Sequence, residues 1–313
     1  MSRRVLAVFA VAALLLAARP AWSADGGVLI GPEALAPSAR ATLVAQIEQA
    51  RGQAPLPFDQ LARVREELPA LDAAKRGRLA SVTPILKSLG RAGLLPMLQE
   101  LAVSARPRGE LRASAWLAWR LALVEAVGML RDLRAALVLE AIVDQGPSEP
   151  PLVQAAVEAF AKLGTDAAAA KLVALSRTAG PKQPPVVAGM GQCRRRAVAE
   201  RLSGLVATRP APGLALHAVR ALGDVGSAWA WQTPAVAASG EEQAVRAAAA
   251  EALLGAIVAY EDPEVRRVAT QAILVVDHPQ TQQMIEARKQ GASSELRAAL
   301  DEVARRFARS PLR

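Results

Sequence analysis

The residues with the most obvious chemical potential in this 313-residue chain are a cysteine and three arginines in a row, Cys193, Arg194, Arg195 and Arg196. Three adjacent cations can lower the pKa of a thiol and favour the nucleophilic thiolate, which would suit a reactive cysteine or a mixed disulfide. We favour the simpler interpretation, an incidental cysteine at the start of a helix. Because the chain has no second cysteine, it forms no internal disulfide, and its fold must depend on buried apolar surface.

The two histidines, His217 and His278, offer little further chemistry. His217 is next to Ala218 in an apolar helical stripe, which indicates a histidine at a helix surface or core edge. Asp277-His278-Pro279 is typical of a turn with a capping aspartate. The sequence has no His-x-x-x-His pair, no paired cysteines, no Gly-x-Ser-x-Gly and no phosphate-binding glycine loop. We therefore predict no catalytic residue, no metal, no cofactor and no enzymatic activity.

The segment before the arginines, residues 180–192, contains three prolines and shows no helical period. We expect a loop insertion near residues 179–192 that exposes Val186, Val187 and Met190. Long loops often contribute to binding, so these three side chains, with the three arginines that follow, are the candidate partner-binding residues. The alternative is a plain crossover between helices.

Repeated amphipathic helices must position these residues. Val265, Ala269, Ala272 and Ile273 are spaced i, i+4, i+7 and i+8, so they share one face of a helix, with Arg266 just off that stripe. The same pattern begins at Leu111, Leu152, Leu214, Val245 and Leu296. An arginine follows the first stripe residue in four of these helices, and we expect it to pair with an acidic group of the neighbouring repeat.

The spacing of the stripes predicts the architecture. Leu214 and Val245 are 31 residues apart, as are Val265 and Leu296, and Leu152 precedes Leu214 by two such periods. A period near 30 residues, filled by two helices and short turns, is typical of an α-solenoid. The 20-residue step from Val245 to Val265 indicates that both helices of one pair carry the stripe.

Turn and cap residues give the expected boundaries. Gly90, Gly128, Gly164 and Gly223 follow apolar stripes, where a left-handed C-terminal cap favours glycine, and Asp262-Pro263 predicts a helix start. No segment alternates as a strand would. We expect helices near residues 38–51, 58–68, 79–90, 93–105, 110–128, 131–144, 151–163, 166–178, 192–207, 212–223, 227–238, 241–260, 263–276, 279–290 and 294–309.

The stretch from residue 261 to 273 and the repeated Val-Arg-x-x-Ala-x-x-Ala-Leu signature resemble HEAT repeats, in particular the short HEAT-like type of phycobilisome lyases and bacterial scaffolds. The resemblance covers roughly residues 80–310. It implies an all-α, right-handed α-α superhelix whose concave side commonly binds proteins. Residues 24–78 do not match the repeat, and we expect either an N-terminal helical cap or a small separate module ahead of a solenoid over residues 79–313.

The first residues have the composition of a secretory signal peptide. Arg3 and Arg4 precede an apolar run over residues 5–18, and Ala21-Trp22-Ser23 predicts cleavage between Ser23 and Ala24. The run is shorter than the roughly 20 residues that span a bilayer, so we expect cleavage, no transmembrane anchor, and a periplasmic or secreted protein. Without residues 1–23, 35 basic residues face 29 acidic ones, a milder excess than the full chain suggests.

From these features we expect an exported, non-enzymatic scaffold or adaptor that binds a protein partner along the solenoid surface. Basic patches around residues 194–196 and 305–309 leave a second possibility, binding of an anionic cell-envelope polymer. A lyase-like or isomerase-like activity would rest on fold analogy alone. Export argues against nucleic acid as a partner, and the spacing of Trp116 and Trp119 on one helix face favours a packed core over base stacking.

Overall fold

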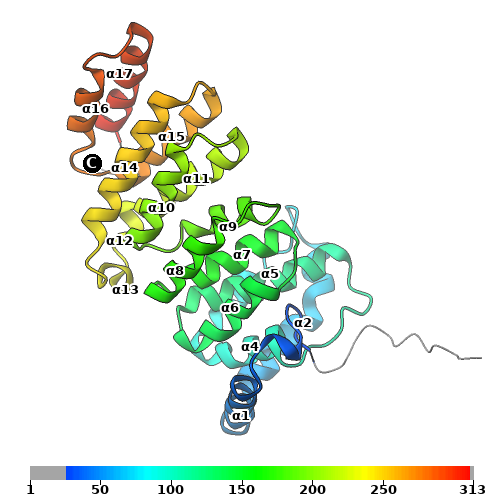
Figure 1. Ribbon diagram of the computed structural model, residues 1–313. Coiled ribbons are helices and arrows are strands. Elements are labelled where there is room, and N and C mark those ends of the chain that lie inside the picture. The colour runs from blue at the N-terminus through cyan, green and yellow to red at the C-terminus, as the bar shows by residue number, and fades with distance from the viewer. Residues whose placement is uncertain (1–25, 311–313) are drawn as a thin grey trace, which may run out of the picture.

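The computed structural model describes residues 26–310, and within that range every regular element is a helix. The predicted all-α class is therefore confirmed. The signal peptide over residues 1–23 and its cleavage point at Ser23 and Ala24 lie outside the described residues and stay predictions. Figure 1 shows the helices stacked along one direction, from α1 and α2 at one end to α16 and α17 at the other.

The helices form two rows that pack on each other. In the first row each helix contacts the next: α3 (Thr83–Ser88), α5 (Ala113–Leu130), α7 (Pro150–Ala161), α9 (Gln183–Met190), α11 (Pro212–Gly226), α15 (Pro263–Val276) and α17 (Ser294–Ala308). The second row holds α4 (Leu94–Ala102), α6 (Ala136–Gln145), α8 (Asp166–Leu175), α10 (Arg196–Ala207), α14 (Glu242–Ala259) and α16 (Thr281–Lys289). Neighbours in sequence pair across the rows, as α6 with α7 and α14 with α15. This arrangement fits a HEAT-like solenoid.

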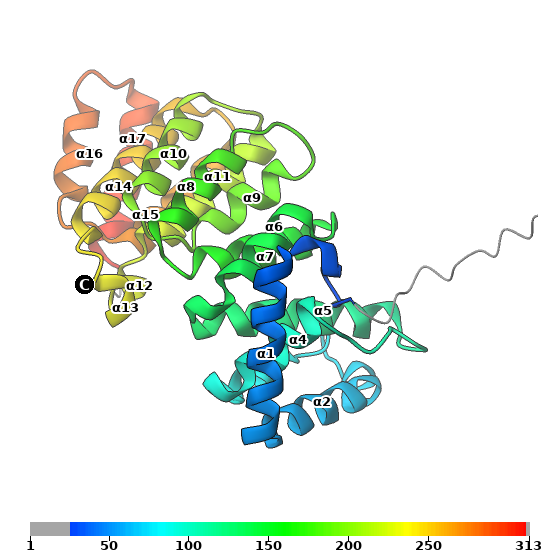
Figure 2. The same cartoon turned by 60° about the horizontal axis from the view of Figure 1, so that its bottom comes forward.

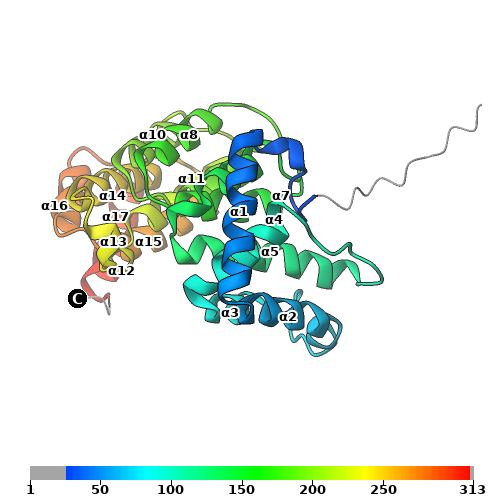
Figure 3. The same ribbon diagram turned by 90° about the horizontal axis from the view of Figure 1, so that it is seen from below.

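The N-terminal helices belong to the same core. α1 (Pro37–Gln53) contacts α4, and α2 (Leu56–Ala73) contacts α4 and α5. Their buried side chains, among them Ile47 and Leu68, join one continuous apolar cluster with those of the repeats. Figures 2 and 3 place α1 and α2 at the opposite end of the molecule from α16 and α17.

The predicted loop insertion near residues 179–192 is wrong, because helix α9 occupies it. Pro184 and Pro185 lie in the first turn of α9, where a missing N–H leaves no helical hydrogen bond unmade. The helix starts at Gln183, which is 31 residues after Leu152. It therefore belongs to the repeat that the 62-residue distance between Leu152 and Leu214 requires. Three short 3-10 helices complete the connections: η1 (Pro32–Ala34), η2 (Gly90–Gly93) and η3 (Leu133–Ala135).

A second difference is the helix expected over residues 227–238. It is two single turns, α12 (Ala228–Trp231) and α13 (Pro234–Ala237), separated at Thr233. A proline disfavours the helical conformation of the residue before it, and Thr233 is extended, with ψ of 120°. The irregular connection between α11 and α14 therefore lies here, next to the turn that carries the arginines.

Two of the four predicted glycine caps are correct. Gly90 and Gly164 have positive φ angles of 58° and 66°. Gly128 and Gly223 instead lie inside α5 and α11, where a Cβ atom at Gly128 would be 2.5 Å from the Cα atom of Ala159. These two glycines let helices of the first row approach closely. At the helix starts, the side chain of Asp262 accepts hydrogen bonds from the backbone N–H groups of Glu264 and Val265, as expected of an N-cap.

The repeated arginines bond mainly to backbone carbonyls rather than to acidic groups of a neighbouring repeat, so the predicted partner is wrong. Arg246 donates to the carbonyls of Val276 and Asp277 at the C-terminal end of α15, and pairs with Glu242 of its own helix. A cation at a helix C-terminus stabilises the exposed carbonyls and the helix dipole. Arg246 thus caps the C-terminal end of α15, the helix that follows its own.

Helix α5 is long and apolar enough, by length and composition, to cross a membrane. Half of that window is buried inside the protein, and α5 contacts α2, α3, α4 and α7. Packing against these four helices accounts for its apolar composition.

Candidate functional site

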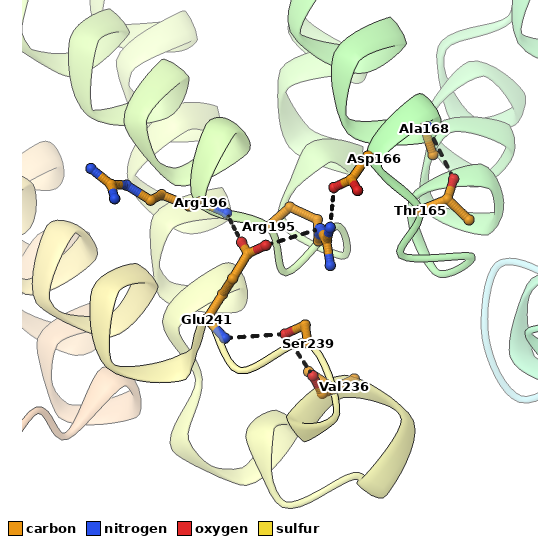
Figure 4. Close-up of polar contacts among 8 residues, drawn as sticks. All are labelled: Thr165, Asp166, Ala168, Arg195, Arg196, Val236, Ser239 and Glu241. Carbon is orange, nitrogen blue, oxygen red and sulfur yellow. Dashed lines mark hydrogen bonds and ion pairs between the residues drawn. The ribbon is translucent and has the colours of Figure 1, made fainter.

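The three predicted arginines have three different environments. Arg194 is buried, with 9% of its surface exposed. Arg195 pairs with Asp166, the first residue of α8, and with Glu241, the residue before α14, at 3.3 Å. Arg196 is exposed and pairs with Glu200, while its backbone N–H donates to Glu241. In Figure 4 the side chain of Arg196 points away from that of Arg195. Arg194 and Arg195 line one cavity, and Arg196 does not.

The other predicted contact residues do not reach the surface. Val186, Val187 and Met190 lie on α9 with at most 5% of their surface exposed, and they pack in the core. Cys193 is also fully buried, and burial raises the pKa of its thiol to about 12, outweighing Arg195 and Arg194, which favour the thiolate. This burial fits the favoured interpretation, an incidental cysteine, better than an activated thiolate.

Four cations gather in a pocket at the turns after three successive helices of the first row. Arg131 follows α5, Lys162 follows α7, and Arg194 and Arg195 follow α9. These cations line a cavity of about 230 Å³ together with Leu133, Gly164, Thr165, Gln192, Val236 and Ser239, among others. We call this cavity the basic pocket.

Hydrogen bonds hold the cations of the basic pocket in place. Arg131 takes the left-handed conformation that ends α5, and its Nη1 donates to the carbonyl oxygen of Lys162 at 2.7 Å. The Nζ of Lys162 lies 3.7 Å from a carboxylate oxygen of Glu158. Arg194 makes one hydrogen bond, from Nη1 to the carbonyl oxygen of Gln192 at 3.2 Å. Its Nε is buried and has no partner within the described chain.

Burial sets the electrostatics of the basic pocket. It lowers the pKa of Arg194 to about 10, and the charge of Arg131 adds to that effect while Asp224 opposes it. Burial also lowers the pKa of Lys162 and of Arg131. At neutral pH Arg194 therefore stays charged, and the pocket presents incompletely solvated basic groups to whatever enters it. An anion would recover the lost solvation.

An apolar groove adjoins the basic pocket. Leu133 and Leu137 expose 61% and 59% of their surface, unusually much for leucine, and they line a cavity of about 300 Å³ with Leu43 and Val138. Leu133 lines both cavities. Arg134, between the two leucines, is already held by a bidentate pair with Asp132. The surface therefore combines a cationic recess with an exposed apolar strip, which we call the apolar groove.

The side chains that line the basic pocket can donate hydrogen bonds to an anion. The basic pocket contains cations, a threonine, a serine and a glutamine, but no carboxylate or histidine. His217 lies on α11 and His278 follows α15, and burial lowers the pKa of both. Among residues 26–310, no group of three or more His, Cys, Asp or Glu side chains is arranged to hold a metal ion.

Sequence reasoning missed Arg131 and Lys162, although a signal was present. Arg131, Lys162 and Arg194 follow one another at steps of 31 and 32 residues, which is the repeat period. A search for the repeat period among apolar residues alone does not detect charged residues that recur in the turns. The same search among the turn residues would have predicted that Arg131, Lys162 and Arg194 lie side by side.

No protein-family model matches the chain, and no curated protein matches it either. Among solved structures, human deoxyhypusine hydroxylase in complex with glycerol is 15% identical with a TM-score of 0.32, over 82% of this chain and 98% of that one. A chain from the computational design of self-assembling cyclic protein homooligomers is 15% identical with a TM-score of 0.21, over 83% of this chain and 98% of that one. Similarity at this level supports no conclusion about activity.

Proposed function

We propose that the protein is a non-enzymatic scaffold or adaptor that binds a protein partner through the basic pocket and the apolar groove. The partner would place a carboxylate in the basic pocket while its apolar side chains cover Leu133 and Leu137. The observation that carries this proposal is the shared wall, since Leu133 lines both cavities. Interfaces combine buried apolar anchors with a few charged contacts in this way.

Two further features support a protein ligand over a small one. Leu133 and Leu137 are exposed on the rim rather than buried in a closed cavity, so they need a broad apolar surface to cover them. The cations of the basic pocket come from three repeats, so a ligand that engages all of them fixes three repeats at once.

A peptide library displayed on phage tests the proposal. Selection on the protein should enrich peptides with Asp or Glu within a few residues of Leu, Ile or Phe. Selection on the Lys162→Gln variant should lose the acidic preference, and selection on Leu133→Gln should lose the apolar one. Val275→Gln is the matched control, because Val275 is 41% exposed on α15 and belongs to neither cavity. Identical enrichment on all four proteins would overturn the proposal.

Binding of an anionic cell-envelope polymer remains the second candidate, and the basic pocket is the observation that favours it. The other basic patch expected to bind such a polymer, around residues 305–309, is a weaker candidate because Arg305 and Arg306 both pair with Glu302. The salt dependence of binding distinguishes the two candidate functions. Capture of a polyphosphate probe should weaken at least tenfold from 50 to 200 mM salt, whereas a selected peptide that covers Leu133 should lose much less.

We also propose that the protein acts outside the cytoplasm, which rests on the sequence of residues 1–23. Expression of the full chain in a bacterial host, followed by cell fractionation and N-terminal sequencing, tests this directly. The expected result is a soluble periplasmic or secreted protein that begins at Ala24. An intact N-terminus in the cytoplasmic fraction would contradict it.

A further inference from the structure

A second cavity lies among the N-terminal helices, away from the basic pocket. It has a volume of about 500 Å³ and is bounded by the end of α1, by α2, by α4 and by the segment after α4. Phe58, Leu61, Ala62 and Pro96 provide its apolar wall. This volume is within the range of pockets that hold small organic molecules. We call it the N-terminal cavity.

The central polar group of the N-terminal cavity is Arg65, which is more than nine-tenths buried, with 8% of its surface exposed. Its Nη2 donates to the carbonyl oxygen of Pro107 at 3.0 Å, and this is its only hydrogen bond within the described chain. Its Nε is buried without a partner, and a guanidinium carries five N–H donors. The rings of Trp116 and Trp119 lie 5.2 and 5.7 Å from its central carbon, so the guanidinium is held in place by packing.

Cations outnumber anions around the N-terminal cavity. The charged groups that line it are Arg51 from α1, Asp59 and Arg65 from α2, Glu100 from α4, and Arg106 from the segment after α4. Asp59 is exposed. One carboxylate oxygen of Glu100, Oε2, is buried, and the carboxyl group faces the buried indole N–H of Trp119. The cavity is thus lined by a fixed guanidinium with a free donor and by a largely buried carboxyl group.

We propose that the N-terminal cavity binds a small organic carboxylate with an apolar body. The ligand's carboxylate would accept hydrogen bonds from the free N–H groups of Arg65, which match its planar geometry. Its body would pack against Phe58 and Leu61. The Glu100 carboxyl group lies where it can share a proton with the ligand's carboxylate, so the two acid groups and Arg65 form one hydrogen-bonded cluster. This site is separate from the proposed partner surface and independent of that function.

Protonation of Glu100 gives ligand binding a specific pH dependence. Burial raises the pKa of Glu100 to about 7, against the attraction of Arg65 and Arg106 and against the hydrogen bond that the indole N–H of Trp119 offers to the carboxylate. Below that pH Glu100 is neutral and donates a hydrogen bond to the ligand, whereas above it two carboxylates would repel. Affinity should therefore fall about tenfold between pH 6 and pH 8, following the fraction of protonated Glu100.

Titration calorimetry with three probes that share a phenyl ring and have similar size tests the site: benzoate, benzyl alcohol and benzylamine. Benzoate should bind at millimolar or lower concentration at pH 6 and about tenfold more weakly at pH 8, and quenching of Trp116 and Trp119 fluorescence should follow binding. Equal affinity for benzyl alcohol would show an apolar cavity only, and tighter binding of benzylamine above pH 7 would show a cation site. Either result, or no benzoate binding, overturns the proposal.

Two variants connect the measurement to the named residues. Glu100→Gln keeps the shape and a donor but cannot ionise, so its benzoate affinity at pH 8 should equal that at pH 6. Arg65→Gln should weaken benzoate binding at least tenfold, with circular dichroism to check that it folds. Arg305→Gln, at an exposed residue of α17, is the matched control and should change nothing. A benzoate affinity that still falls tenfold in Glu100→Gln would contradict the role of Glu100 even if Arg65→Gln does not fold.

Discussion

At the residue scale, Glu100 has a largely buried carboxyl group whose charge state changes near neutral pH. The folded protein holds its proton up to pH about 7, whereas its ordinary pKa is 4.5. Since the folded pKa is raised, the contribution of Glu100 to stability is full below pH 4.5, falls as pH rises to 7, and stays low above. The Glu100→Gln variant should raise the free energy of unfolding at pH 8 by about 1–3 kcal/mol, and by much less at pH 5.

Urea denaturation of both proteins at pH 5 and pH 8 measures this difference. Glu67→Gln is the control, because Glu67 is an exposed residue of the same N-terminal region and should give no pH-dependent change. Equal effects of Glu100→Gln at both pH values would mean that Glu100 is ionised in the folded protein.

A second prediction at the residue scale concerns the reactivity of Cys193. Its thiol is fully buried and its pKa is raised to about 12 by burial. The folded protein should therefore react with Ellman's reagent at pH 8 at least a hundredfold more slowly than the protein in 6 M guanidinium chloride. Fast reaction of the folded protein would restore the interpretation of Cys193 as a reactive thiol.

The arginines after Cys193 show what sequence reasoning can and cannot give for a single residue. The basic character of the site was predictable, and two of its four cations were among the candidates. The sequence does not show that Arg194 turns inward while Arg196 turns outward, because this depends on how α9 packs against α7 and α11. Adjacent residues in a turn point in different directions, and no periodicity distinguishes them.

At the element scale, most helices were predictable because their apolar stripes recur with the repeat period. Helix α9 was missed because Pro184 and Pro185 resemble loop residues, although prolines in a first turn are compatible with a helix. The step of 62 residues from Leu152 to Leu214 already required an intermediate repeat beginning near residue 183. Val187 and Met190 occupy the stripe positions of that repeat, which explains their burial. Periodicity was the better guide than local composition.

Gly128 gives a prediction about helix spacing. A Cβ atom there would lie 2.5 Å from the Cα atom of Ala159, so Gly128→Ala must push α5 and α7 apart. We expect a loss of about 1–3 kcal/mol in the free energy of unfolding. Gly255→Ala is the control, since Gly255 lies inside α14 with open space around it, and it should gain about 0.5–1 kcal/mol from helix propensity. If both variants are stabilised in urea denaturation, close packing at Gly128 is not required.

At the scale of the whole molecule, stability is a sum of contacts between neighbouring repeats. Helices of the first row contact the next helix in the row, and α16 and α17 contact only α14, α15 and each other among the stronger helix pairs. Yet the buried apolar residues form one continuous cluster from the N-terminal helices to Phe307. The repeat count and the order of helices follow from the sequence period. The way in which the turns of neighbouring repeats meet, as at the basic pocket, follows from the stacking of the helices and cannot be read from any one repeat.

Removal of the last helix pair tests this nearest-neighbour arrangement. A chain truncated after residue 279 loses α16 and α17, and with them the buried Leu300 and Phe307. Hydrogen exchange should show at least a tenfold loss of amide protection in α14 and α15, and a change of less than twofold in α5 and α7. The Phe307→Ala variant of the full chain should loosen the same two helices to a smaller degree, because it removes one buried side chain of α17 without shortening the protein. Equal loss of protection in α5 and α7 would mean that the protein unfolds as one cooperative unit, and the coupling between the two ends would then have to run through the continuous core rather than from repeat to repeat.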